Sequence, residues 1–348
     1  MTVLRIGRIL TAAWLCAALA ACGGGADEAS GDGERSTRTP VDTTVGGLGS
    51  DPVAPLTGEV LADDERLDRP AIVVKVDDSP RALGQQEGLA DADLVYVERV
   101  EGGALRLAAV FHSTDATAGP VRSARTSDLG LTGNLDRPLF AYSGANGGVL
   151  RMVRDADLVD LGYDAFPDHY VERGTGVLRF FVDTGDLRAV APAGGGPPTQ
   201  LLEYREPGAP VTNAGTEPTT GVTIRYPGTP GTEVEYRRDG DGWARLQDGE
   251  PHLLDGGEQV TPDNVIVQLI EYRSSGFVDV NGAESPEAVV TGEGGAWVLT
   301  GGELIRARWS RPDLGDPTAY TDSAGDPVRF APGTTWVELA EAGTASTT

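Results

Sequence analysis

The chain has 348 residues, of which 53 are acidic and 28 basic, so its formal net charge at pH 7 is −25. Nucleic acids and anionic lipid headgroups bind clusters of lysine and arginine, which excludes nucleic acid as an expected partner of so acidic a chain. Both cysteines, Cys16 and Cys22, lie near the N-terminus, so the body of the chain has no disulfide, cysteine-ligated zinc or catalytic thiol.

Residues 1–21 have the parts of a secretory signal peptide: two arginines, an apolar run too short to span a bilayer, and small residues at the end. The four residues around the expected cleavage site, Leu19-Ala20-Ala21-Cys22, match the bacterial lipobox. We therefore expect Cys22 to be acylated (palmitate or similar chains) and to anchor a lipoprotein on the extracytoplasmic face of the cell membrane. Many Arg, Gly and Ala with one lysine, Lys75, indicate a high-GC, actinobacterial host.

Composition divides the remaining chain into five segments. Residues 22–66 are rich in Gly, Ser, Thr, Asp and Pro, which is typical of a flexible tether. Residues 67–198 are expected to form an N-terminal domain and residues 199–220 a linker that follows a Gly- and Pro-rich breaker. Residues 221–342 are expected to form a C-terminal domain, and residues 343–348 a disordered tail.

In the N-terminal domain, segments with the apolar pattern of strands alternate with segments that have the apolar pattern of helices. Buried strands are expected at 71–76, 94–100, 105–111 and 138–142, and helices at 123–135, 148–161 and 184–190. Strands and helices mixed in this way predict an α+β (or α/β) domain.

The C-terminal domain has short strands and tight turns without helical periodicity. Strands are expected at 222–226, 233–237, 243–246, 264–272, 288–291, 296–300, 304–309 and 335–339. The turn at 239–242, Asp-Gly-Asp-Gly, is a hairpin signal and lacks the later glutamate of a calcium-binding loop. We therefore expect a mostly antiparallel β domain. The four tryptophans in its strands pack in the core or, alternatively, form a surface on which sugar rings stack.

Polar side chains gather where the first three strands begin or end. The candidate polar cluster consists of Asp77, Asp78, Glu98, Glu101 and Arg106. Ends of strands are where α/β sheets collect ligands. Carboxylates there could also bind a cation or act as acid and base. The three histidines have no metal spacing, so we expect no metal and no cofactor.

A pair of arginines opens the helix expected at 123–135. Arg122 and Arg125 flank Ser123, a candidate N-cap, so that Arg125 would lie in the first helical turn. A cation at the positive end of a helix is unfavourable unless an anion or carboxylate compensates it. Two interpretations stay open: an anion-binding clamp made by Arg122, Ser123 and Arg125, or a structural salt-bridge cluster that holds the loop on the sheet.

Eight motifs along the chain form a recognisable series. Those of the N-terminal domain are Pro70-Ala-Ile-Val-Val-Lys-Val-Asp-Asp-Ser79, Gly88-Leu-Ala-Asp-Ala-Asp-Leu-Val-Tyr96, Glu101-Gly-Gly103, Leu107-Ala-Ala-Val-Phe111 and Gly119-Pro-Val-Arg-Ser-Ala-Arg125. Those of the C-terminal domain are Asn264-Val-Ile-Val-Gln268, Trp309-Ser-Arg311 and Pro332-Gly-Thr-Thr-Trp336. The series resembles the YerB-like bacterial lipoproteins, a family with paired N- and C-terminal domains of unknown function. The resemblance spans about residues 68–340, and the motif at 119–125 is its most specific element.

The chain departs from the family pattern in two places. The family has Asp-Asn where this chain has Asp77-Asp78, and a Pro-His-Asn element where this chain has Leu178-Arg-Phe-Phe-Val182. If that histidine and asparagine served a reaction, this member has lost it. The resemblance therefore implies a fold, a domain split and lipidation, and it implies no activity.

Three functional hypotheses follow. The first is a non-catalytic, membrane-tethered binding or assembly factor that holds an anionic group, on a cell-wall polymer or an envelope protein, with Arg122 and Arg125. The second is an envelope glycan hydrolase or transferase with Asp77, Glu98 or Glu101 as acid and base, which requires carboxylates that face one another in an open cleft. The third, a scaffold, predicts no pocket.

Overall fold

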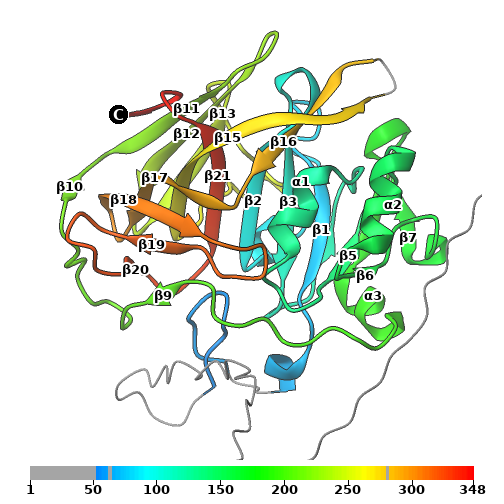
Figure 1. Cartoon of the computed structure of the whole chain (residues 1–348), viewed down its shortest axis with the longest axis horizontal. Coiled ribbons are helices and arrows are strands. Elements are labelled where there is room, and N and C mark those ends of the chain that lie inside the picture. The colour runs from blue at the N-terminus through cyan, green and yellow to red at the C-terminus, as the bar shows by residue number, and fades with distance from the viewer. Residues whose placement is uncertain (1–51, 62–64, 280–281) are drawn as a thin grey trace, which may run out of the picture. The chain divides into compact units, whose positions relative to one another are not determined.

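The structure, a computed structural model, describes residues 52–61, 65–279 and 282–348, which belong to one compact unit that starts at Gly49. The expected signal peptide, the expected lipidation site Cys22 and most of the expected tether lie outside the described residues. The described chain is mostly β structure (Figure 1). In these ranges no helix has the length and apolar character needed to cross a membrane.

The largest sheet contains strands from both halves of the sequence. Among the described residues it has twelve strands, ten of them in one continuous order and two, β16 and β19, paired to β15 and β18 at its side. The order is β10 (Thr216–Pro218), β18 (Glu303–Arg311), β17 (Gly292–Thr300), β15 (Asn264–Val278), β21 (Thr335–Glu341), β2 (Leu94–Arg99), β3 (Leu105–Phe111), β1 (Ile72–Asp77), β5 (Leu139–Ala141) and β6 (Val159–Asp160), with β16 (Glu284–Val289) and β19 (Ala319–Thr321) beside it.

Strand β21 joins the two halves of this sheet. It lies between β2 and β15 and runs parallel to both, with Trp336 opposite Val95 on one side and Val265 on the other. From the sequence, we expected these strands to belong to two domains. In the structure their backbones share one hydrogen-bonded sheet, because the last long strand returns to the centre of the chain's fold (Figure 1).

Smaller elements cover the two faces of the central sheet. The smaller sheets consist of β14 (Glu250–Pro251), β13 (Gly242–Gln247), β12 (Thr232–Asp239), β11 (Gly221–Tyr226) and β22 (Ala345–Thr347); of β4 (Thr117–Ala118), β8 (Phe180–Asp183) and β7 (Tyr170–Glu172); and of β20 (Arg329–Phe330) and β9 (Glu203–Tyr204). The α-helices are α1 (Thr126–Thr132), α2 (Gly147–Asp155) and α3 (Thr184–Val190). Short 3-10 turns are η1 (Glu65–Asp68), η2 (Leu89–Asp91), η3 (Glu101–Gly103), η4 (Pro167–His169) and η5 (Gly176–Leu178).

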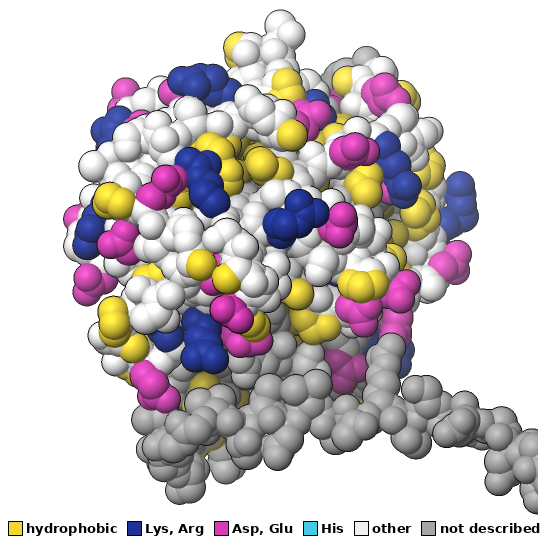
Figure 2. Space-filling model, turned by 60° about the vertical axis from the view of Figure 1, so that its left-hand side comes forward, with side chains coloured by type: hydrophobic (Ala, Val, Ile, Leu, Met, Phe, Trp, Pro, Cys, Tyr) yellow, Lys and Arg dark blue, Asp and Glu magenta, His cyan; other side chains and the backbone are white. Residues whose placement is uncertain are grey.

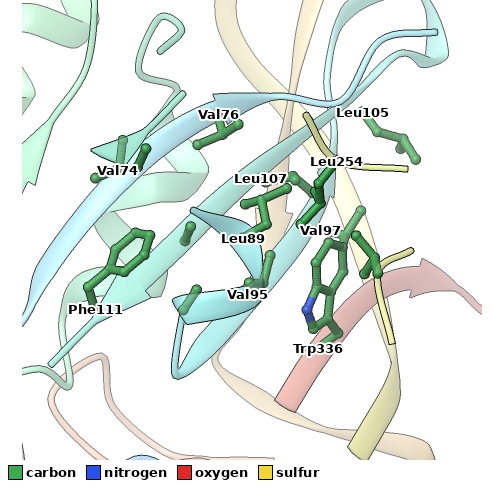
Figure 3. Packing of buried hydrophobic residues seen from close by; sticks show 14 of the residues in the cluster. Val74, Val76, Leu89, Val95, Val97, Leu105, Leu107, Phe111, Leu254 and Trp336 are labelled. Atoms are coloured by element: carbon green, nitrogen blue, oxygen red, sulfur yellow. The ribbon is translucent and has the colours of Figure 1, made fainter. Parts of the chain in front are cut away.

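Alternation along the central strands creates two cores. Val74 and Val76 of β1 and Val95 and Val97 of β2 point to the same side, toward Trp336 of β21 (Figure 3). This core also contains the apolar face of the five-stranded sheet. The intervening side chains point to the opposite side and pack with α1 and α2. Burial of both faces explains why these strands read as continuous apolar runs.

Several expectations about the fold need correction. The C-terminal part is rich in β structure, as expected, whereas the N-terminal part is not clearly α+β, because its helices are short. Helix α1 covers only part of 123–135. Helix α2 ends at Asp155, because Leu158 and Leu161 of the helical pattern belong to the next strand region, whereas α3 has the expected bounds.

Parts of the expected tether and of the expected disordered tail belong to the folded body. Residues 52–61 lie in the segment expected to be a flexible tether, but Leu56 is buried in the core and its carbonyl accepts a hydrogen bond from Tyr204 Oη at 2.5 Å. At the other end, Ala345–Thr347 form β22, which pairs with β11, instead of a disordered tail. A few apolar contacts and one strand edge suffice to order such segments.

Candidate functional site

The alternation of side chains along β1 to β3 decides where each member of the candidate polar cluster points. Lys75 and Asp77 of β1 and Glu98 of β2 replace apolar residues on the face covered by the helices. Arg106 of β3 lies opposite both Asp77 and Glu98 in the strand register. Asp78 points away from this group, because successive residues at the end of a strand face opposite sides.

Asp77 holds two arginines. Its Oδ2 atom accepts a hydrogen bond from Arg122 Nη1 at 2.6 Å, and its Oδ1 atom lies 3.3 Å from Arg106 Nη1. Oδ1 also accepts from the backbone N–H of Ser79. Only 1% of the Asp77 side chain is exposed, so this carboxylate positions the arginines and does not itself face solvent.

Arg125 is held by a second carboxylate. Its Nε and Nη2 atoms donate to Glu101 Oε1 and Oε2, each at 2.8 Å, and Ser285 Oγ donates to Glu101 at 2.6 Å. Burial acts to raise the pKa of Glu101, but the hydrogen bonds and charge of Arg125 outweigh it and lower that pKa. Glu101 is therefore ionised and paired at neutral pH.

The start of α1 differs from the expectation. The helix begins at Thr126 and Arg125 occupies the N-cap position, so Ser123 is not the cap and Arg125 is not in the first turn. Asp128 instead reaches back, and its Oδ2 atom accepts from the Arg125 backbone N–H at 2.7 Å. An acidic residue at this position compensates the positive helix end.

A cavity of about 700 Å³ lies next to these side chains, and we call it the arginine cavity. Its polar wall contains Glu101, Arg106, Arg122, Ser123 and Arg125, so the structure brings the three candidate anion-binding residues together with two of the polar cluster. The opposite walls come from η5, the start of α2 and the arm formed by β15 and β16 (Figure 1), and their larger apolar members include Val149, Val177 and Phe277.

The cavity is lined by three positive and two negative side chains. The guanidinium groups are those of Arg106, Arg122 and Arg125, and the carboxylates are those of Glu101 and Asp279. The buried carboxylate of Asp77 pairs with Arg106 and Arg122. Burial lowers the pKa of Arg106, and the charges of Arg122 and Arg125 lower it further, against the opposite effect of Asp77. In the described contacts Arg106 and Arg122 donate to protein acceptors through Nη1 alone. Their other N–H groups are thus available to an anion in the cavity.

Two members of the candidate polar cluster lie elsewhere. Glu98 contacts the ammonium of Lys75 beneath α1. Asp78 forms a buried ion pair with Arg245 of β13 on the other face of the sheet. The sequence placed all five residues together, because proximity along the chain does not reveal which face of a strand a side chain occupies.

This geometry contradicts what the hydrolase hypothesis requires. Asp77, Glu98 and Glu101 are each paired to a cation, and the first two are shielded from solvent. They do not face one another across an open cleft. In the part of the chain that the structure describes, no group of three or more His, Cys, Asp or Glu side chains could hold a metal ion. The scaffold hypothesis also fails in its expectation, since a cavity is present.

Remaining candidates from the sequence serve packing. His112 and His252 are fully buried, and Trp243, Trp309 and Trp336 are at most 3% exposed, which fits the core interpretation of these tryptophans. Trp297 is partly exposed and stacks on Arg306 at 3.9 Å from its ring centroid.

No motif in the sequence indicated that the arm forms a wall of the cavity. Phe277 and Ser285 belong to the arm, more than 150 residues after Arg122 in the chain. Glycine at position 148 allows the Phe277 ring to lie against the start of α2, since a Cβ there would come within 2.1 Å of the ring. These residues could have been found only by predicting which distant segments of the chain contact each other.

Comparisons with known proteins agree with this architecture. Residues 56–184 match the family described as "Protein of unknown function (DUF3048) N-terminal domain", and residues 222–337 match its C-terminal domain. A crystal structure of the YerB protein from Bacillus subtilis superposes with a TM-score of 0.69 at 21% sequence identity, covering 85% of this chain and 99% of that chain. This likeness shows a shared fold. No curated protein matches the chain.

Proposed function

Since the chain belongs to the YerB-like family of two-domain proteins of unknown function, we propose that it is a binding or assembly protein of the cell envelope whose arginine cavity holds an anionic group. The observation that carries this proposal is the convergence of Arg106, Arg122 and Arg125 on one cavity. Asp77 and Glu101 hold the three guanidinium groups in place before any ligand arrives. A preorganised site loses little side-chain entropy on binding.

The two kinds of wall define the ligand class. Arginines line one side of the cavity, whereas Val149, Val177 and Phe277 line the other. A carboxylate or phosphate would accept from Arg106 and Arg122, and an apolar portion of the same molecule would displace water from the far wall. The ligand is therefore an amphipathic molecule, or a polymer segment, with one anionic group.

The surface charge favours a single anionic group over a polyanion. The chain has a net charge of −25, and on the face shown in Figure 2 basic and acidic side chains are interspersed without a large basic patch. A polyanion would meet repulsion over most of such a surface. One anionic group inside the cavity meets three guanidinium groups, against the carboxylates of Glu101 and Asp279.

Calorimetric titration with three matched probes tests this proposal: octyl phosphate, inorganic phosphate and octanol. We expect octyl phosphate to bind most tightly, because it alone matches both walls. Arg122→Ala removes a charge-assisted contact of about 1.5–3 kcal/mol and should weaken binding about ten- to hundredfold. Arg308→Ala, which removes an exposed arginine remote from the cavity, is the control. Failure of both phosphates to bind, or unchanged affinity in Arg122→Ala, would contradict the proposal.

The place of action is a second part of the proposal. Cys22, in a lipobox, would carry the acyl chains that hold the protein on the outer face of the membrane. Fractionation of cells that express the wild type and Cys22→Ser tests it. The wild type should sediment with membranes, and the variant should be found in the soluble fraction. Equal distribution of the two would contradict lipid anchoring without bearing on the cavity.

A further inference from the structure

The single lysine of the chain lies in an unusual position. Lys75 is in the middle of β1, and none of its side chain is exposed. Its Nζ atom contacts two carboxylates, Glu98 of β2 and Asp128 of α1, and these side chains are also fully buried. This group, which we call the lysine triad, is not used by the arginine cavity.

The two carboxylate oxygens of Asp128 have different partners. Its Oδ1 atom lies 2.7 Å from Lys75 Nζ. Its Oδ2 atom accepts from the backbone N–H of Arg125 at 2.7 Å. A backbone donor on Oδ2 stabilises negative charge that develops on that atom when a nucleophile attacks the carboxyl carbon. The nucleophile in position to do so is Lys75 Nζ.

Glu98 supplies a group that can relay protons. It contacts the same Nζ atom from β2, across the intervening strand β3. Burial raises the pKa of Glu98, and the charge of Asp128 adds to this, although Lys75 acts in the opposite direction. One ammonium with two ionised carboxylates would leave a net negative charge without solvent, which is costly. Amide formation would remove two of these three buried charges, those of Lys75 and Asp128.

We propose that Lys75 and Asp128 become joined by an intramolecular amide (isopeptide) bond, with Glu98 as the catalytic acid and base. Lys75 Nζ first passes one proton to Asp128 Oδ1, which leaves a neutral amine and a carboxylic acid. The lone pair of Nζ then forms the new C–N bond to Asp128 Cγ. Ionised Glu98 takes a second proton from Nζ and delivers it to Oδ1, so Glu98 ends as it began. The bond from Cγ to Oδ1 breaks, and Oδ1 leaves with its electron pair and both protons as water. The ammonium and carboxylate become an amide and one water, without oxidant, reductant or cofactor.

The consequence is a covalent tie between β1 and α1. These residues are 53 positions apart, and β2 and β3 lie between them in the chain. A link of this kind restricts the unfolded chain in the same way as a disulfide does. It needs no cysteine, and the described residues contain none.

Because the chain has one lysine, a lysine-specific protease tests the proposal directly. The full chain is denatured and digested with a protease that cleaves only after lysine. We expect the wild type to remain uncut, because an amidated lysine is not a substrate. Tryptic digestion should then yield one linked pair of peptides carrying Lys75 and Asp128, lighter than the sum of the two by one water. Cleavage of the wild type after Lys75, or a link to Glu98 instead, would overturn the proposal.

Variants separate the roles of the two carboxylates. Glu98→Gln removes the proton relay, and Asp128→Ala removes the acceptor, so both should be cut once after Lys75. Asp128→Asn keeps the acyl carbon and should form the same link with loss of ammonia in place of water. An unlinked Asp128→Asn together with an unlinked wild type would show an ordinary buried ion pair. The wild-type mass decides the question even where a variant fails to fold.

Discussion

The carboxylate of Asp78 lies 2.8 Å from the guanidinium of Arg245, 167 residues further along the chain, and neither side chain is exposed to solvent. The pair connects the end of β1 to β13 of the five-stranded sheet. Arg245 also lies 3.6 Å from Glu338 of the central strand β21, and its guanidinium stacks on Trp336. This buried network holds the two sheets together through polar contacts in an otherwise apolar core.

We expect Asp78→Ala to destabilise the protein by about 3–5 kcal/mol, because it leaves Arg245 buried with one distant carboxylate. Urea denaturation monitored by tryptophan fluorescence measures the free energy of unfolding. Glu293→Ala is the control, since it removes one partner of an ion pair whose side chains are both more than 60% exposed, and exposed pairs contribute little. Similar losses in the two variants would contradict the role of the buried pair.

Asp78→Asn addresses the departure from the family pattern. Asparagine keeps an oxygen that can accept from Arg245 but removes the charge that balances it. The loss of unfolding free energy should therefore be smaller than that of Asp78→Ala and still measurable. A wild-type free energy in Asp78→Asn would show that Glu338 alone compensates Arg245.

His112 gives the protein a stability that depends on pH. It is fully buried, and burial, reinforced by the charges of Arg69 and Arg188, lowers its pKa to about 4. In the unfolded chain a histidine has a pKa of about 6.5. Between these two values the unfolded state binds more protons than the folded state, so stability falls as the pH falls through this range.

Replacement of this histidine should remove that dependence. Between about pH 7 and about pH 4, wild type should lose up to about 3 kcal/mol more than His112→Asn. Urea denaturation series at several pH values measure the two curves, and their offset near pH 7 gives the cost of lost packing. Parallel curves over the whole range would show that His112 does not titrate between the two states.

More of the central strands than of the candidate site could be predicted from the sequence. Apolar runs located most central strands, because β1 to β3 are buried on both faces. They could not reveal that β21 inserts between β2 and β15, since register and neighbours depend on contacts between distant segments. The Gly119–Arg125 motif located the arginines and suggested nearby carboxylates as their partners. The specific pairing, Arg122 with Asp77 and Arg125 with Glu101, emerged only from the fold.

The contact between the arm and the start of α2 provides a test of the cavity wall. A Cβ on Gly148 would lie 2.1 Å from the Phe277 ring, so Gly148→Ala should displace Phe277 and destabilise the protein by about 1–3 kcal/mol. Displacement of this ring should also weaken octyl phosphate more than inorganic phosphate. Gly147→Ala is the matched control, because a Cβ at that adjacent position of the same helix meets no atom within 4 Å. Equal effects of the two substitutions would contradict the proposed wall.

Glu101 competes with a bound anion for Arg125. Its two carboxylate oxygens occupy Nε and Nη2 of that arginine, and it also adds a negative charge to the cavity. Glu101→Gln removes the charge while retaining the size of the side chain. We therefore expect this substitution to tighten anion binding by about tenfold, or about 1.4 kcal/mol, opposite in sign to Arg122→Ala. Glu293→Gln makes the same change of net charge at an exposed ion pair with Arg308 and should leave the affinity unchanged. If Glu101→Gln weakened binding instead, the loss of the preorganisation that Glu101 gives to Arg125 would outweigh the relief of competition, and the prediction would be wrong.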